Sequence, residues 1–432
     1  MKTKQLLLIP ILLCVNLIIS ENAKALPAFA MRENVSCTLC HTNGSAPHLT
    51  KTGYLYRRAG FRFPTYIGNL EKDNEALKVL LHLAVGVNAD YQITDQQTPA
   101  TQTAPASSEG LTANNFDMRE AEIWPLVGGF FGNYGFWSEV DFTPSTVSNG
   151  GGASLADTEL RYIWGNADTF YSIRAGFIGA EGYGASDQWI DDGNIPLFDT
   201  LAAQYNGINT LSIPLGAFNN PQLGFEFQGN LNETHFTAGI YNGFDGSNGL
   251  ATNTQSTAAP QYMNPNAKGA KDYKAQVDQF LGDKFELTGV YYNGTTSLLD
   301  PTNSVVWVNN YALWRLYGTY AVVPNVVDAL AGLAQGSYNY VNSGSNTVAG
   351  SFRNIGAFVG GNYYVQPHLT FSARYDYFNY AYGTTPAPRA IAYVLMASLP
   401  YDNNIFVFHF NRTQDDIAGL SNDFRAEWRF LF

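Results

Sequence analysis

The chain has 432 residues and a formal net charge of -12, and only 14% of its residues are charged. An acidic chain of this kind argues against nucleic-acid binding, because nucleic-acid-binding domains carry a basic surface. Soluble domains have about 25% charged residues, and here aromatic residues match the charged ones at 14%. This balance is typical of transmembrane β-barrels, in which apolar and polar residues alternate along each strand.

The first 25 residues have the parts of a secretory signal peptide. A basic start with two lysines precedes an apolar run over residues 6–19, and Ala23-Lys24-Ala25 supplies a small-x-small cleavage signal. We expect residues 1–25 to be removed and the mature chain to begin at Leu26. No later run of 18 apolar residues predicts a transmembrane helix.

The strongest chemical motif is C-x-x-C-H, present as Cys37-Thr38-Leu39-Cys40-His41. Two thiols at this spacing can bond to the two vinyl groups of one haem, and the adjacent histidine then binds its iron. A Cys37–Cys40 disulfide also fits an oxidising compartment. Zinc needs four ligands, and no second cysteine pair follows. The motif predicts one covalent haem c, with His41 as the proximal ligand.

The sixth iron ligand is left open by the sequence. His48 follows His41 by seven residues and is the nearest candidate, and its alternative role is that of a solvent-exposed loop histidine. Paired histidines would lower the haem potential relative to a methionine–histidine pair. Met31 and His82 are the other nearby donors. The haem segment, residues 26–75, is too short to bury a core by itself and should pack against the rest of the chain.

Residues 76–432 show the period-two pattern of β-strands. In residues 369–377, apolar side chains alternate with serine, arginine and aspartate, and residues 223–228 alternate in the same way. The chain ends on a strand with Phe424, Ala426, Trp428, Phe430 and Phe432 on one face. An apolar face opposite charges of both signs fits a barrel with lipid outside and a polar lumen. A soluble β-sandwich would also alternate, but with more uniformly short turns.

The connections alternate in length, as they do in outer-membrane barrels. Short turns are expected at 132–135, 166–168, 231–233, 282–283, 324–325, 366–367 and 402–403. Longer loops are expected near 94–114, 144–156, 179–221, 243–271, 294–304, 342–350, 382–387 and 414–420. These connections predict an all-β barrel of about 16 antiparallel strands in the outer membrane, in contact with its lipid, with both termini in the periplasm.

A haem beneath the barrel would leave a long path for an electron, because the apolar band is about 25 Å tall. A barrel of about 16 strands encloses a channel wide enough to be plugged. We therefore expect the haem segment to plug the lumen. The alternative is an open pore with the haem outside it.

Several stretches resemble the fused monohaem cytochrome–porins of iron-oxidising bacteria. They are Leu26-Pro27-Ala28-Phe29-Ala30-Met31-Arg32, the C-x-x-C-H motif, Pro47-His48-Leu49, residues 53–61 and residues 121–129. The chain departs from the family pattern at Met31 and at Tyr54, where the family has arginine. The resemblance implies oxidation of extracellular Fe(II), with the electron passed through the haem to a periplasmic carrier.

Three functions therefore stand as hypotheses. The first is an electron conduit that oxidises extracellular iron or a similar donor. The second is the same conduit running outward to reduce an external acceptor. The third is a diffusive porin in which the haem segment is only a plug. A steady ionic conductance would distinguish the third from the first two.

Overall fold

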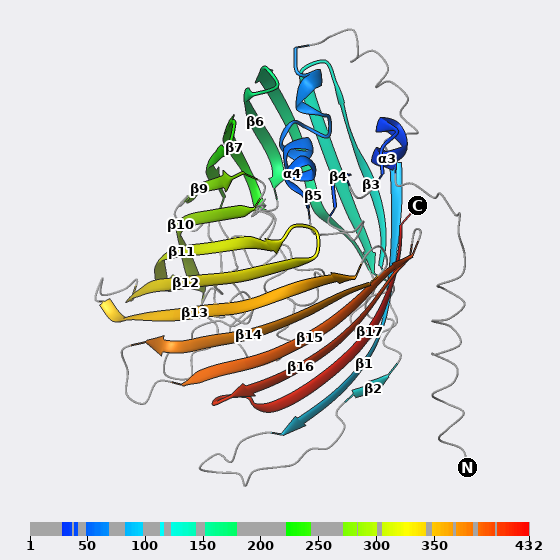
Figure 1. Ribbon diagram of the computed structural model, residues 1–432. Helices are drawn as coiled ribbons and strands as arrows, with labels where there is room; N and C mark the ends of the chain where they lie inside the picture. The colour runs from blue at the N-terminus through cyan, green and yellow to red at the C-terminus, as the bar shows by residue number, and fades with distance from the viewer. Residues whose placement is uncertain are drawn as a thin grey trace, which may run out of the picture.

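The computed structural model describes most of the chain after residue 27. The described residues are 28–36, 39–41, 49–68, 83–97, 113–115, 122–143, 152–178, 222–242, 271–282, 284–299, 305–342, 348–365, 369–382, 388–401 and 404–431. They form two α-helices, one 3-10 helix and seventeen β-strands. The strands dominate the molecule (Figure 1).

The helical elements all lie before the first strand. They are α3 (Ala28–Glu33), α4 (Lys51–Arg58) and the 3-10 helix η3 (Pro64–Tyr66). Within the described residues, no helix combines the length and the apolar character that crossing a bilayer demands.

The strands follow one another in chain order. Their bounds are β1 (Leu83–Gln97), β2 (Ala113–Asn115), β3 (Glu122–Phe131), β4 (Tyr134–Thr143), β5 (Gly152–Gly165), β6 (Thr169–Ile178), β7 (Gln222–Leu231), β8 (Thr234–Tyr241), β9 (Asp272–Leu281), β10 (Phe285–Leu299), β11 (Val305–Val323), β12 (Val327–Asn342), β13 (Val348–Val365), β14 (Leu369–Tyr382), β15 (Arg389–Tyr401), β16 (Asn404–Asp415) and β17 (Gly419–Leu431).

The sheet closes on itself. From β3 to β17 each strand pairs antiparallel with the next, and β17 pairs with β1, which in turn pairs with β3. The closing register places Gly86 opposite Leu431 and Gln97 opposite Leu420. Closure gives the edge strands β1 and β17 a partner. A sheet in lipid must be closed in this way, because an unpaired backbone group there has no water with which to form a hydrogen bond.

The barrel has sixteen strands around its circumference. The three-residue β2 pairs with β1 beyond the end of β3, so that β2 and β3 share one side of β1. Gln92 pairs with Asn115 of β2, and Asn88 pairs with Glu122 of β3. The predicted barrel of about sixteen antiparallel strands is confirmed.

The two ends of the barrel differ in the length of their strand connections, as the sequence predicted. Short connections join β3 to β4, β5 to β6, β7 to β8, β9 to β10, β11 to β12, β13 to β14 and β15 to β16. We call this the short-turn end, and β1 begins and β17 ends at it. The opposite end, which we call the long-loop end, joins β6 to β7 and β8 to β9 through the longest connections. The expected loop at 179–221 lies outside the described residues.

Several strands extend further toward the long-loop end than the sequence pattern indicated. β5 begins at Gly152 and β10 continues to Leu299, both inside segments expected to be loops. The expected loop at 414–420 is only a three-residue turn between β16 and β17. Its cause is Asp415, whose Oδ1 accepts hydrogen bonds from the backbone N–H groups of Ile417 and Ala418 at 2.7 and 3.2 Å.

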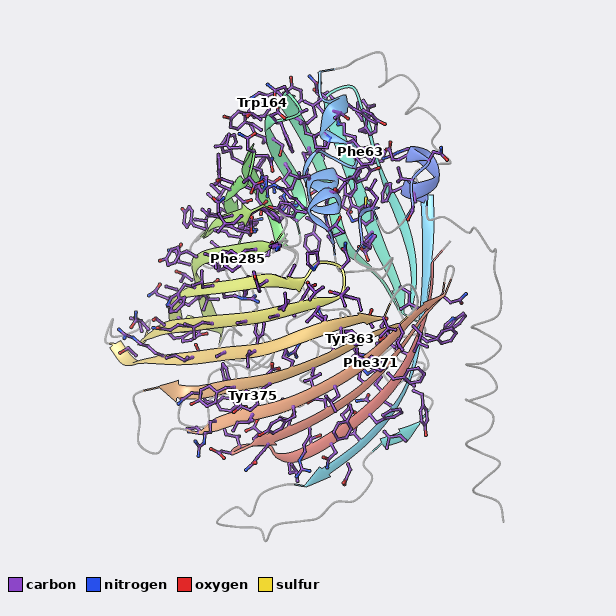
Figure 2. The ribbon with its side chains drawn as sticks, in the orientation of Figure 1. Phe63, Trp164, Phe285, Tyr363, Phe371 and Tyr375 are labelled. Atoms are coloured by element: carbon purple, nitrogen blue, oxygen red, sulfur yellow. The ribbon has the colours of Figure 1, made fainter. Side chains whose placement is uncertain are left out.

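The two faces of the barrel are chemically opposite. On β7, Phe225 is 61% exposed, whereas its neighbour Glu226 is 1% exposed. Figure 2 labels Tyr363, Phe371 and Tyr375, which are among the exposed aromatic side chains of the outer face. On β14 the charged neighbours of Tyr375, Arg374 and Asp376, are 5% and 1% exposed. This inversion of the usual soluble pattern is that of a barrel facing lipid.

The apolar outer face predicts a depth-dependent cost for charge. Val277, 50% exposed near the middle of β9, should tolerate leucine. Val277→Arg should destabilise the barrel by about 2–4 kcal/mol, because a charge at the bilayer midplane loses its hydration. Denaturant unfolding from lipid vesicles measures both variants. Equal stability of the two would show that β9 does not face lipid.

Candidate functional site

The C-x-x-C-H motif is joined to the start of α4 by backbone contacts. The N–H of Thr50 donates to the carbonyl of Cys40 at 2.8 Å, and His41 forms an isolated antiparallel bridge with Leu49. Thr50 also caps α4, because its Oγ1 accepts from the N–H of Gly53 at 3.2 Å. The same hydroxyl donates to the carbonyl of Leu39 at 2.6 Å. One residue therefore fixes both the helix start and the motif.

Gly53 lets the motif approach the helix closely. A Cβ built at Gly53 would lie 2.1 Å from the carbonyl oxygen of Cys40, a distance that no side chain can occupy. Glycine is thus required here for close backbone packing. The side chains of Cys40 and His41 are each partly exposed.

A different side of α4 faces the barrel. Lys51, Tyr54 and Arg58 are spaced three and four residues apart, so they share one face of the helix. Their partners are inward-facing or turn residues of β7, β8 and β9. We call the inward face of β5–β9 the docking wall and residues 28–68 the N-terminal segment. Figure 1 shows α4 beside these strands, near the short-turn end.

Tyr54 is fixed by a buried hydrogen bond. Its hydroxyl donates to Oδ2 of Asp278 on β9 at 2.9 Å. Burial raises the pKa of Tyr54 well above its ordinary value, so the phenol stays protonated and keeps its role as donor. Its ring contacts His235 and Phe280, with centroid distances of 5.3 and 5.6 Å.

Arg58 makes the most extensive contact with the docking wall. Its Nε donates to Oδ1 of Asn230 at 2.6 Å, and its Nη1 donates to Oγ1 of Thr237 at 3.1 Å. Its Nη2 donates to the carbonyl of Phe236 at 2.9 Å. The side chain is 1% exposed. A buried guanidinium needs partners for its donors, and β7 and β8 provide them.

The docking wall also reaches back to the helix. Nη1 of Arg161 on β5 donates to the carbonyls of Arg57 and Arg58, at 3.1 and 2.9 Å. Arg161 therefore binds the C-terminal end of α4. Last-turn carbonyls have no partner within a helix, so a cation there satisfies them and favours the helix dipole.

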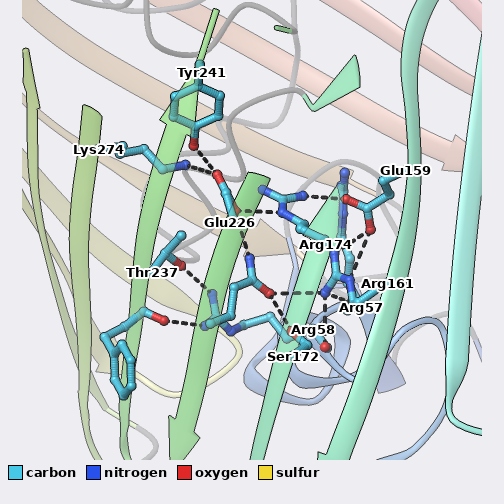
Figure 3. A network of polar contacts seen from close by, with 12 residues as sticks. Arg57, Arg58, Glu159, Arg161, Ser172, Arg174, Glu226, Thr237, Tyr241 and Lys274 are labelled. Atoms are coloured by element: carbon cyan, nitrogen blue, oxygen red, sulfur yellow. Dashed lines mark hydrogen bonds and ion pairs between the residues drawn. The ribbon is translucent and has the colours of Figure 1, made fainter. Parts of the chain in front are cut away.

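Arg161 belongs to a buried chain of alternating charges (Figure 3). Glu159 bridges Arg161 and Arg174 at 2.5 and 2.6 Å, and Glu226 bridges Arg174 and Lys274 at 2.6 and 2.8 Å. Each charge has an opposite neighbour, as burial in the lumen requires. This row of ion pairs extends from the docking site of α4 across β5, β6, β7 and β9.

The rest of the N-terminal segment packs through aromatic rings. Phe61 stacks against both Phe29 of α3 and Trp137 of β4, with centroid distances of 5.5 and 5.0 Å. Arg32 donates to the Tyr56 hydroxyl and to the Phe61 carbonyl. Burial raises the pKa of Tyr56 well above its ordinary value. The contact with β4 adds apolar attachment to the polar attachment of α4.

The predicted site residues divide into two groups. Cys40 and His41 are described and lie together against the start of α4. Cys37 and His48 lie outside the described residues, as does His82, whereas Met31 lies in α3. Sequence reasoning missed the anchors Tyr54 and Arg58. The alternation of Asp272, Lys274, Gln276 and Asp278 along β9 was a readable sign of a polar inner face there.

The fold is similar to that of solved outer-membrane channels. An outer membrane channel, DcaP, of Acinetobacter baumannii matches with a TM-score of 0.52 and 12% identity, covering 81% of this chain and 96% of that one. An anion-selective porin from Comamonas acidovorans matches with a TM-score of 0.51 and 10% identity, covering 81% and 99%. No protein-family model and no curated protein sequence matches the chain. The likeness is one of fold.

Removing the Arg58 side chain should release the N-terminal segment. Arg58→Ala leaves Asn230 and Thr237 without their donor, and hydrogen bonds to a charged group are worth about 1.5–3 kcal/mol each. We expect residues 28–68 to be cleaved faster by protease while the barrel stays intact. Arg57→Ala is the matched control, since it removes the neighbouring arginine side chain and keeps the backbone carbonyl that accepts from Arg161. Equal cleavage of both variants would contradict the docking role of Arg58.

The ion pair between Lys51 and Glu233 predicts that protease cleavage of the N-terminal segment depends on pH. Nζ of Lys51 lies 2.8 Å from Oε1 of Glu233, in the turn between β7 and β8. The hydrogen bond from Lys51, followed by that from the Gly282 N–H, lowers the pKa of Glu233 below 4.5. A lowered carboxyl pKa gives stability that is present above 4.5 and lost as pH falls through the folded value. Protease cleavage of the segment should increase over that window.

Glu233→Gln provides the control for this pH dependence. The glutamine cannot titrate, so any rise in cleavage that persists in the variant as the pH falls below 4.5 comes from other carboxylates. An unchanged profile in Glu233→Gln would remove the Lys51–Glu233 pair from the explanation.

Proposed function

We propose that the chain is an outer-membrane electron-transfer protein that carries one covalent haem c at its N-terminal segment. Its most specific form is oxidation of extracellular Fe(II), with the electron delivered to a periplasmic carrier. The short-turn end and both termini then face the periplasm, as in barrels whose long loops are extracellular.

The observation that carries the proposal is the C-x-x-C-H motif within a segment that docks on the inner face of a membrane barrel. A motif in a loose tail would need no built docking site. Here Tyr54, Arg58 and Phe61, all within 21 residues of Cys40, contact β9, β7–β8 and β4. A redox centre attached there would be held at a fixed place relative to the lumen.

The described residues fit a haem in two respects. Cys40 and His41 are partly exposed, so a thioether and an iron bond can form without unfolding the helix against which they lie. Gly53 lets that helix lie close against the Cys40 backbone, so the motif is held at a fixed place beside α4. Cys37 and Cys40 would hold the macrocycle and His41 its iron. When bound, haem supplies a one-electron redox centre.

This chain's own residues would perform the remaining tasks. Arg58 and Tyr54 hold α4 against the docking wall, and Thr50 fixes the backbone of Cys40 next to His41. His48 is the candidate for the second axial position. The buried, mutually paired charges of the docking wall give the segment a polar surface on which to dock.

A diffusive channel is the second candidate function, and the likeness of fold to outer-membrane channels favours it. In that case the N-terminal segment would only restrict the pore. Conductance in planar bilayers separates the two ideas. A plugged conduit should pass little current until Arg58→Ala releases the segment, whereas an open channel conducts equally with and without that change. An outward electron path differs from the inward one only in the direction of net flow.

The deciding experiment is anaerobic stopped flow of the purified protein with Fe(II). We expect the reduced c-type absorbance to appear rapidly in the wild type and in Thr38→Ala, which keeps both cysteines and His41. His41→Ala should lose this response, because the iron loses its proximal ligand. A haem that is reduced by dithionite but not by Fe(II) at any pH would refute iron oxidation and leave an electron conduit for another donor.

Cys37→Ala tests whether haem and barrel are separable. We expect loss of the covalent haem with normal barrel assembly, since every strand pairing lies outside the motif. Haem staining of a denaturing gel reports attachment, and heat-modifiable migration reports the barrel. Loss of both would show that the haem segment is needed for assembly.

A further inference from the structure

His235 of the docking wall is buried in apolar surroundings. It lies on β8, is 0% exposed and points toward the N-terminal segment. Among the described residues, neither its Nδ1 nor its Nε2 has a hydrogen-bond partner. Most buried polar groups are hydrogen-bonded, and an exception calls for an explanation. His235 differs in this from Arg174 and Glu226 of the same wall, which are paired with each other.

Side chains of the N-terminal segment lie against this imidazole. Its ring contacts Tyr54 of α4 and Phe280 of β9, with centroid distances of 5.3 and 5.4 Å. Two cations of α4 lie over the same rings, with Nζ of Lys51 5.4 Å from the Phe280 centroid and Cζ of Arg58 5.5 Å from the Tyr54 centroid. A proton on His235 would add a third positive charge to this enclosed site, and burial of an unpaired charge is costly. The docked segment therefore requires a neutral histidine.

The carboxylate beside His235 is occupied by the segment. Asp278 lies directly opposite His235 in the β8–β9 register, and Cβ atoms of such pairs are about 4.5–5.5 Å apart. In the docked state, Oδ2 of Asp278 accepts from the Tyr54 hydroxyl at 2.9 Å. Its other hydrogen bonds come from Thr288 and Gln276. Departure of Tyr54 would free an acceptor position next to the histidine.

The other polar groups around this site have different partners. On β7, the residue opposite His235 is Asn230, which cannot titrate and accepts from Arg58. Glu233, in the turn before β8, is paired with Lys51. Glu286 of β10 is within electrostatic range of Tyr54. Asp278 is thus the carboxylate placed directly across from the imidazole.

We propose that His235 is a pH-sensitive switch that releases the N-terminal segment from the docking wall in mildly acidic solution. With the segment docked, Asp278 binds Tyr54 and His235 stays neutral. With the segment released, His235 reaches water, takes up one proton and pairs with Asp278. That ion pair competes with the return of Tyr54. The proposal depends on the docking of the segment and not on haem.

The direction of the effect follows from this one proton. A histidine in water is protonated below about pH 6.5. Below that value the released state binds one more proton than the docked state, so docking weakens as the pH falls, by up to about tenfold per pH unit. The pair of Lys51 and Glu233 is lost only below 4.5, so the two effects are separated along the pH scale.

The test is limited proteolysis of the purified full-length protein from about pH 8 to about pH 5, on both sides of the ordinary histidine titration. The cleavage rate of residues 28–68 is divided at each pH by that of denatured casein, which corrects for the pH dependence of the protease. Cleavage follows the population of the released segment when docking is fast relative to cleavage. We expect the wild-type ratio to rise by up to about tenfold per pH unit below about pH 6.5.

His235→Phe should abolish this rise, because phenylalanine keeps the ring contacts with Tyr54 and Phe280 but cannot take up a proton. His409→Phe is the matched control. His409 is 5% exposed on the inner face of β16, outside the docking wall, and its Nε2 lies 3.6 Å from Oε2 of Glu427. This variant should show the wild-type rise. If His235→Phe fails to form a heat-modifiable barrel, His235→Gln gives the same test, since glutamine cannot titrate either.

Asp278→Asn tests the competition for the carboxylate. The amide oxygen of asparagine can still accept from Tyr54, but a neutral amide does not form an ion pair with a charged imidazole. We expect the rise in cleavage to begin at a lower pH than in the wild type. An unchanged profile would contradict the pairing of His235 with Asp278.

Two further outcomes would overturn the proposal. A wild-type ratio that stays constant over the whole range would show that docking is not linked to a proton. An equal rise in the wild type and in His235→Phe would place the titrating group elsewhere. Neither outcome bears on covalent haem attachment, which haem staining reports separately.

Discussion

Closure of the sheet is the constraint on which the rest of the structure depends. Lipid offers no partner to a backbone N–H or C=O, so the strand edges of β1 and β17 must pair with each other. A closed sheet in lipid sends its apolar side chains outward, and the polar ones are left to line the interior. The buried charges of Glu159, Arg174 and Glu226 follow from that inversion. The interior then becomes a surface on which a polar, arginine-bearing helix can dock.

The N-terminal segment uses this interior in a way that a soluble core would not allow. Arg58 is as buried as a core leucine, yet its donors have partners because strand residues such as Asn230 and Thr237 face inward. Phe61 and Trp137 add an apolar contact beside it. A segment too short to fold alone thereby obtains a core from its own barrel. At the start of β9, Asp272 also lies in this polar interior and accepts hydrogen bonds from the hydroxyls of Tyr292 and Tyr311.

Much of the fold could be predicted from the sequence because strand period and turn chemistry are local. The alternation in residues 369–377 and the turn at Asn166 predicted their strands correctly. The turn at 416–418 was missed, since its tightness depends on the side-chain hydrogen bonds of Asp415 as well as on the positive φ of Gly419. The contacts of Tyr54 and Arg58 could not be predicted, because they join residues more than 170 positions apart. Sequence spacing identifies a motif such as Cys37–His41, but it does not say which strand lies behind it.

The close approach of Gly60 and Gly135 has a consequence for biogenesis. A Cβ at Gly135 would lie 2.6 Å from the Cα of Gly60, so the two backbones touch without intervening side chains. Such a contact leaves no clearance for a bulky folded unit to slide past β4 once the ring of strands has shut. The order of events during export is therefore constrained: the backbone around Gly60 must reach β4 before the ring of strands closes.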